Sequence, residues 1–176
     1  MLPSAGQTVV SLALRPLEDG CPWPLTRVLT ALGALDVERV GVARALGDRH
    51  GTPLVHSQGL QWREHELFVE ARHEPRGADE LTLELPPWDE LSVAVAEEEI
   101  WRVIDTVAAG ADAQFGSIGD GEAPETALPD DAAMLRAQLR RHLALLLPAW
   151  SEEDVADAGA SAARLLEASG LLVVTP

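Results

Sequence analysis

The chain has 176 residues, a net charge of −16 at neutral pH and 47% hydrophobic residues. This hydrophobic fraction is too high for a disordered acidic tail, so length and composition predict one globular domain, at most with an appended subdomain. The charge excludes duplex nucleic acid and disfavours anionic membrane surfaces as partners, because both are bound through clustered basic side chains.

The N-terminal part of the sequence predicts a β-α-β unit. Residues 8–15 alternate between larger apolar and smaller side chains, which is typical of a strand with one well-buried face. Pro24 suits the first turn of a helix, and leucines and valines at helical spacing follow it. Residues 38–43 alternate again, so we expect a second strand there.

The middle of the sequence predicts an antiparallel meander and a second β-α-β unit. Residues 66–72, 81–85 and 91–96 each alternate, and short turns join them. The clearest amphipathic helix follows over residues 98–109, and a short strand follows over residues 113–118. Together these elements indicate a split β-α-β, ferredoxin-like core with additional strands.

The C-terminal part of the sequence predicts a helical hairpin. The first helix is expected to begin after a cap at Asp130 or Asp131 and to continue to Leu147. A second helix is expected between a cap at Ser151 and the glycine stop at Gly170. Residues 171–174 are wholly apolar and β-prone, so we expect them to return to the main sheet.

The predicted fold class is therefore α+β. An antiparallel-dominated sheet with split β-α-β (ferredoxin-like) elements occupies residues 1–119. Residues 120–131, which are rich in glycine, proline and acidic residues, form a linker or loop. The C-terminal helical hairpin and the final strand occupy residues 132–176, and we expect them to pack on the same domain.

The sequence lacks the standard catalytic and nucleotide-binding motifs. It contains no dinucleotide-binding glycine pattern, no P-loop and no nucleophile elbow. The pair His65-Glu66 begins like a zinc-protease motif, but Val69 stands where the second histidine ligand belongs. The sequence therefore predicts no cofactor and favours a protein that is not an enzyme.

Four of the five histidines fall between residues 50 and 73, and histidine is the commonest transition-metal ligand. His56 and His65 are the candidate ligands, although their spacing matches no compact metal module and solvated histidines are the simpler interpretation. Cys21 and Asp112 are the further candidates for such a pocket. The alternative function is therefore an enzyme that binds a small ligand or a metal around residues 50–73.

Two tryptophans and two arginines are the candidates for binding a partner protein. Trp62 lies in a polar segment and Trp88 at a Pro-Pro-Trp-Asp turn, so we expect neither ring to be fully buried. A tryptophan that closes the edge of the core is the simpler interpretation of each. Arg136 and Arg140 lie one helical turn apart, and they either pair with acidic residues across the hairpin or bind an anionic group.

The acidic residues are concentrated in the second half of the chain. Residues 1–88 carry a net charge of −4 and residues 89–176 a net charge of −12. The absence of Lys, Asn and Tyr indicates a GC-rich bacterial genome, but that bias does not explain the surplus of Asp and Glu. Solubility is the simplest reason for the surplus; a basic partner and adaptation to salt are the others.

The leading hypothesis is a non-enzymatic, cytoplasmic protein that binds another protein, as an immunity protein, an inhibitor or an adaptor does. A basic partner would associate rapidly and in a salt-dependent manner. The single cysteine, the lack of a signal-peptide pattern and the lack of an apolar run of ~20 residues favour the cytoplasm. A subunit of a homo-oligomer is the third hypothesis.

Overall fold

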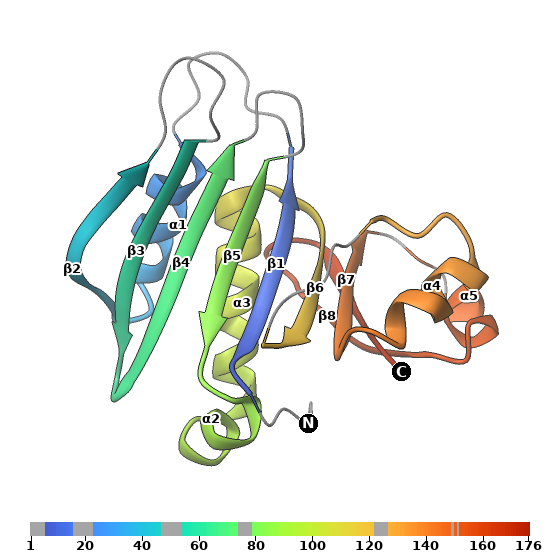
Figure 1. Ribbon diagram of the computed structural model, residues 1–176. Helices are drawn as coiled ribbons and strands as arrows, with labels where there is room; N and C mark the ends of the chain where they lie inside the picture. Colours follow the sequence, from blue (N-terminus) through green and yellow to red (C-terminus); the bar gives the residue numbers. More distant parts are fainter. Residues whose placement is uncertain are drawn as a thin grey trace.

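The computed structural model describes residues 6–15, 23–46, 54–73, 79–121, 127–148, 150 and 152–176. Within these residues, nine strands form one antiparallel sheet in the order β2-β3-β4-β5-β1-β6-β7-β9-β8 (Figure 1). The strands are β1 (Thr8–Leu14), β2 (Val37–Leu46), β3 (Leu54–Trp62), β4 (His65–His73), β5 (Glu80–Leu85), β6 (Ala113–Asp120), β7 (Ala144–Pro148), β8 (Ser161–Leu165) and β9 (Leu171–Thr175). The helices are α1 (Pro24–Gly33), α2 (Trp88–Ala94), α3 (Glu97–Ala111), α4 (Ala132–Leu139) and α5 (Glu152–Asp157). The chain is thus a sheet-dominated α+β protein.

Strand β1 lies near the centre of the sheet, and its alternating residues define the two faces. It pairs with β5 on one side and with β6 on the other. Val10, Leu12 and Leu14 point to the face that holds the main hydrophobic core. Val9 and Ser11 point to the opposite face, because successive side chains of a strand alternate.

Helices α1 and α3 pack against each other on the core face, behind the sheet in the view of Figure 1. Helix α1 begins at Pro24, whose missing N–H suits the first turn of a helix. The two helices approach closely at Gly110, where a Cβ atom would lie 3.2 Å from the Cα atom of Val28. Helix α3 has three glutamates in its first turn, where the helix dipole favours negative charge.

Helices α4 and α5 cover the opposite face of the sheet, at the β7–β9 end. Ser11, Ser117 and Leu145 are register partners across β1, β6 and β7, so their side chains share one face. Leu145 belongs to a second hydrophobic cluster with Leu135 of α4 and Val155 of α5. In the described part of the chain, no helix covers this face over the strands from β2 to β1, and Figure 1 views the molecule from this open face.

The expected C-terminal helical hairpin is wrong. Residues 132–147 divide into the short helix α4 and strand β7, and residues 161–165 form strand β8. Strand β7 is buried on both faces, because Leu146 packs in the main core while Leu145 and Leu147 pack under α4 and α5. A strand that is buried on both faces has a continuous run of apolar residues in its sequence. Periodicity cannot distinguish such a run from a segment of a buried helix.

The expected second β-α-β unit is also wrong, and with it the split β-α-β, ferredoxin-like arrangement. Residues 91–96, which alternate as a strand would, belong mostly to helix α2. Pro87 at the N-cap position and the acidic residues Asp89 and Glu90 in the first turn favour this helix. The expected ferredoxin-like core is replaced by a nine-stranded antiparallel sheet, in which the strand before α2 and α3 is β5 and not residues 91–96.

Candidate functional site

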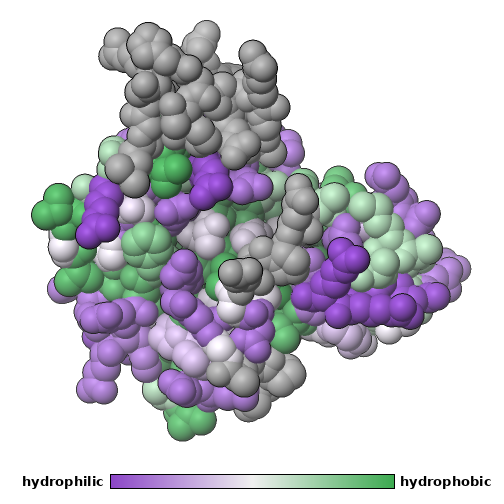
Figure 2. All heavy atoms as spheres, viewed as in Figure 1, coloured by the Kyte–Doolittle hydropathy of each residue, from purple (hydrophilic) through white to green (hydrophobic). Residues whose placement is uncertain are grey.

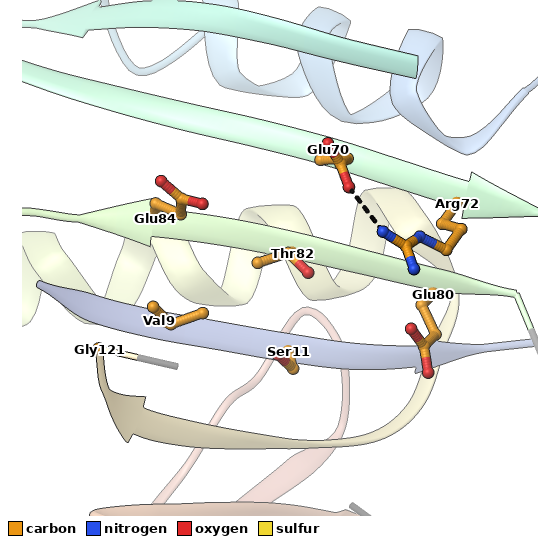
Figure 3. Close-up of a pocket in the computed structure, with 8 residues that line it drawn as sticks. All are labelled: Val9, Ser11, Glu70, Arg72, Glu80, Thr82, Glu84 and Gly121. Atoms are coloured by element: carbon orange, nitrogen blue, oxygen red, sulfur yellow. Dashed lines mark ion pairs between the residues drawn. The ribbon is translucent and has the colours of Figure 1, made fainter. Parts of the chain in front are cut away.

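The candidate site is a hollow of about 430 Å³ on the open face of the sheet, over strands β4, β5 and β1 (Figure 3). On a sheet face that no helix covers, side chains from several neighbouring strands are accessible to a ligand. The residues that line the hollow are Val9, Ser11, Glu70, Arg72, Glu80, Thr82, Glu84 and Gly121.

The register of the sheet places these side chains in rows across the strands. Glu70, Thr82 and Ser11 are successive partners across β4, β5 and β1. Arg72 is the partner of Glu80 in the next row. The alternation that places leucines of β5 in the core therefore directs its polar residues into the hollow.

The hollow carries three carboxylates and one guanidinium group. An Nη atom of Arg72 lies 3.6 Å from a carboxylate oxygen of Glu70, in the ion pair that Figure 3 marks with a dashed line. Glu84 accepts a hydrogen bond from the side-chain amide of Gln7 at 3.2 Å. Glu80 is exposed, and its carboxylate forms no hydrogen bond or ion pair with any residue that the structure describes. The hollow therefore has a surplus of negative charge that suits a cationic ligand.

A second hollow, of about 400 Å³, adjoins the first on the same face. Phe68 of β4 is the register partner of Glu84 on one side and of Gly59 on the other, so one row of side chains connects the two hollows. The lining is more apolar than that of the first hollow. It consists of Gln7, Val40, Gly41, Gly59, Leu60, Glu66, Leu67 and Phe68. Figure 2 accordingly shows hydrophilic and hydrophobic residues next to each other on this face.

The candidate tryptophans are not part of either site on the open face. Trp62 has 3% of its surface exposed and Trp88 has 0%, so the expectation that they are incompletely buried is wrong. Both rings belong to the main core, and Trp88 packs against Trp101 with 5.0 Å between ring centroids. The Pro-Pro-Trp-Asp segment is the start of helix α2 and not an exposed turn. Trp88 is the first residue of this helix, directly after Pro87, and its side chain is buried. Neither ring is presented to a partner in this structure.

The candidate arginines lie on helix α4 and at its end, and neither lines the hollows. Arg136 donates hydrogen bonds from Nε to the carbonyl oxygen of Ala158 at 3.0 Å and from Nη2 to that of Asp157 at 2.6 Å. It thus caps the end of α5 instead of pairing with the acidic side chains that the sequence suggested. Arg140 is exposed at the end of α4.

The histidine candidates for a metal site are not brought together. His56 is the register partner of Ala71, and His65 that of Trp62, so the two histidines lie at opposite parts of the β3–β4 pair. Within the described residues, no group of three side chains of the metal-binding type converges. His50 and Cys21 lie outside the described residues.

His73 and Asp79 share a hydrogen bond that no pattern in the sequence predicts. The ring of Trp23 lies 5.1 Å from that of His56 and 6.0 Å from that of His73, centroid to centroid. Asp112, the other pocket candidate, is an exposed residue that ends α3 in the left-handed conformation. Among the described residues, Trp23, His56 and His73 thus lie near the end of the β3–β4 pair that is opposite to His65.

Comparison of the chain with protein-family models, with curated proteins and with solved structures finds no match. The helices of the described segments are all too short or too polar to cross a membrane. What the site can do must therefore be inferred from its own geometry and charge.

Proposed function

We propose that the chain is a non-enzymatic binding module whose open sheet face binds a basic segment of a partner protein. An immunity protein, an inhibitor or an adaptor in the cytoplasm would act in this way. The observation that carries the proposal is the hollow over β4, β5 and β1, which holds the three carboxylates of Glu70, Glu80 and Glu84 and a single arginine. No helix of the described residues covers this part of the sheet.

The charge of the whole chain supports the same partner. A net charge of −16 attracts a cationic protein over distances of about one Debye length, roughly 8–10 Å at physiological ionic strength. The three carboxylates then supply the contacts that orient the bound segment. Such a complex forms rapidly and loses association rate as the salt concentration rises.

The test compares binding of a fluorescently labelled hexa-arginine peptide to the wild-type chain and to charge variants, by fluorescence anisotropy. Glu80→Gln and Glu84→Gln each remove one negative charge from the hollow. Glu90→Gln removes one negative charge from an exposed residue of α2, and it is therefore the charge-matched control. We expect the site variants to weaken binding about fivefold and the control to change it less than about twofold.

Equal effects of all three substitutions would contradict the proposal, because the peptide would then respond only to the net charge of the chain. Undetectable binding of the peptide to the wild-type chain at low ionic strength would also contradict it. Circular dichroism of each variant verifies that the substitutions leave the fold intact.

A further inference from the structure

We propose that the basic segment bound at the first hollow also carries an apolar side chain, which enters the second hollow beside Phe68. This inference rests on the proposed function, and it specifies the chemistry of the partner. A purely cationic ligand would leave the second hollow unused, although it lies on the same face and adjoins the first hollow.

The second hollow has the lining that an apolar side chain requires. Phe68 is partly exposed, and the neighbouring Gly59 places no side chain over β3. Val40 is the register partner of Gly59 on the other side, and 43% of its surface is exposed. Exposed apolar surface next to a charged hollow is typical of a recognition surface, since burying it adds affinity to the electrostatic attraction.

The edge strand β2 keeps this hollow open. The pairing between β2 and β3 is regular up to Val40 and Gly59, then shifts, and becomes regular again at Arg44 and Ser57. Gly41, the residue after Val40, has a positive φ of 70° and no side chain, and it lines the hollow. The bulge therefore turns β2 without placing a side chain of Gly41 over Phe68.

The spacing of the two hollows defines the pattern of the bound segment. Glu70 and Phe68 are two residues apart on β4, which corresponds to roughly 7 Å along a strand. In an extended segment, side chains i and i+2 lie on the same side at about this separation. The proposed segment therefore has an arginine or lysine followed or preceded, two positions away, by an apolar residue.

The experiment uses two capped, labelled peptides, Arg-Arg-Ser-Leu-Ser and Arg-Arg-Ser-Ser-Ser, which differ only at the apolar position. We expect the leucine peptide to bind the wild-type chain at least about threefold more tightly. Val40→Ser and Phe68→Ser should each abolish this preference. Val42→Ser is the matched control, because Val42 is 87% exposed and lies outside the lining of the hollow.

The outcomes separate this inference from the proposed function. If both peptides bind equally and Glu80→Gln weakens both, the inference is wrong and the proposed function stands. If Glu80→Gln affects neither peptide, the proposed function is wrong as well. A leucine preference that survives Val40→Ser and Phe68→Ser also overturns the inference. Should Phe68→Ser fail to fold, Val40→Ser decides, because Val40 is not part of the core.

Discussion

The carboxylate of Asp105 in helix α3 accepts two hydrogen bonds from Ser169, one from the backbone N–H at 2.9 Å and one from the hydroxyl at 2.7 Å. A third hydrogen bond comes from the backbone N–H of Ala168 at 2.9 Å. These residues form the turn between β8 and β9, so the contact fixes the last hairpin of the sheet to the main core. Arg164 of β8 adds to this contact, since its guanidinium lies 5.6 Å from the ring of Trp101 in α3.

We expect Asp105→Ala to lower the free energy of unfolding by about 2 kcal/mol, because it leaves two backbone N–H groups and one hydroxyl without their acceptor. Asp105→Asn keeps one acceptor oxygen and removes the charge, so its loss should be smaller. Urea denaturation followed by tryptophan fluorescence measures both values. Equal stability of the alanine variant and the wild-type chain would show that the turn does not depend on this carboxylate.

The pairing of β1 with β6 gives a second prediction about stability. A Cβ atom added at Gly116 would lie 2.5 Å from the carbonyl oxygen of Ser11 and 2.7 Å from Cδ2 of Leu12. Gly116→Ala must therefore displace the backbone of the central strand, and we expect a loss of about 2–3 kcal/mol in the free energy of unfolding.

Gly33→Ala is the matched control for that substitution. Gly33 is the last residue of α1, and a Cβ placed there would meet no atom within 4 Å apart from its chain neighbours and the backbone of its own helix. Alanine there should stabilise the chain by up to about 1 kcal/mol, because glycine loses more backbone entropy in a helix. Thermal denaturation of both variants provides the comparison. A stable Gly116→Ala variant would contradict the close approach of β1 and β6.

His142 gives a prediction about pH. It has 5% of its surface exposed, and its Nδ1 atom has no hydrogen-bond partner in the described residues. Burial lowers the pKa of His142 below its ordinary value of 6.5, and the neighbouring Arg141 lowers it further. The unfolded chain therefore binds a proton at a higher pH than the folded chain does. The contribution of His142 to stability is complete above about pH 6.5, and it is lost as the pH falls below that value.

Urea denaturation at about pH 7.5 and about pH 5.5 tests this prediction. The wild-type chain should lose stability between the two conditions, and His142→Gln, which cannot be protonated, should lose less. His65→Gln, at the start of β4, is the control and should follow the wild-type chain. If His142→Gln loses as much stability between the two pH values as the wild-type chain does, protonation of His142 is not the cause of the acid sensitivity.

Local pattern and local chemistry could predict many elements of the fold, including the final strand β9, but not helix α2 or strands β7 and β8. Strand β1, helix α1 and helix α3 lie where alternation, Pro24 and the helical spacing predict them. Leu143 to Leu147 could not be assigned in this way, because burial on both faces depends on α4 and α5 packing against β7. The alternation in residues 91–96 was overridden by the helix-favouring chemistry of Pro87 and the acidic residues after it.

The candidate site was beyond prediction for a related reason. Glu70, Thr82 and Ser11 are far apart in sequence, and they meet only through the register of three strands. Their polar character predicts a solvated face, but whether another layer covers that face depends on the whole sheet order. Trp62 and Trp88 are buried although their neighbours in sequence are polar, because polar neighbours do not report the burial of a side chain.

The ion pair between Arg72 and Glu70 leads to the last prediction, which rests on the proposed function. Arg72 is the cation that already lies in the hollow, with its side chain 47% exposed and 3.6 Å from Glu70. It therefore competes with the arginine of a bound peptide for the same carboxylate. Arg72→Gln should raise the affinity for the hexa-arginine peptide about threefold or more, because it frees Glu70 and removes a repelling charge.

Arg102→Gln provides the control, since Arg102 is an exposed residue of α3 and its removal changes the net charge of the chain by the same amount. Helix α3 lies on the covered face of the sheet, so this variant should change the affinity less than about twofold. Fluorescence anisotropy at low and at high ionic strength measures both. If Arg72→Gln and Arg102→Gln strengthen binding equally, net charge alone governs the affinity and Arg72 does not compete within the hollow.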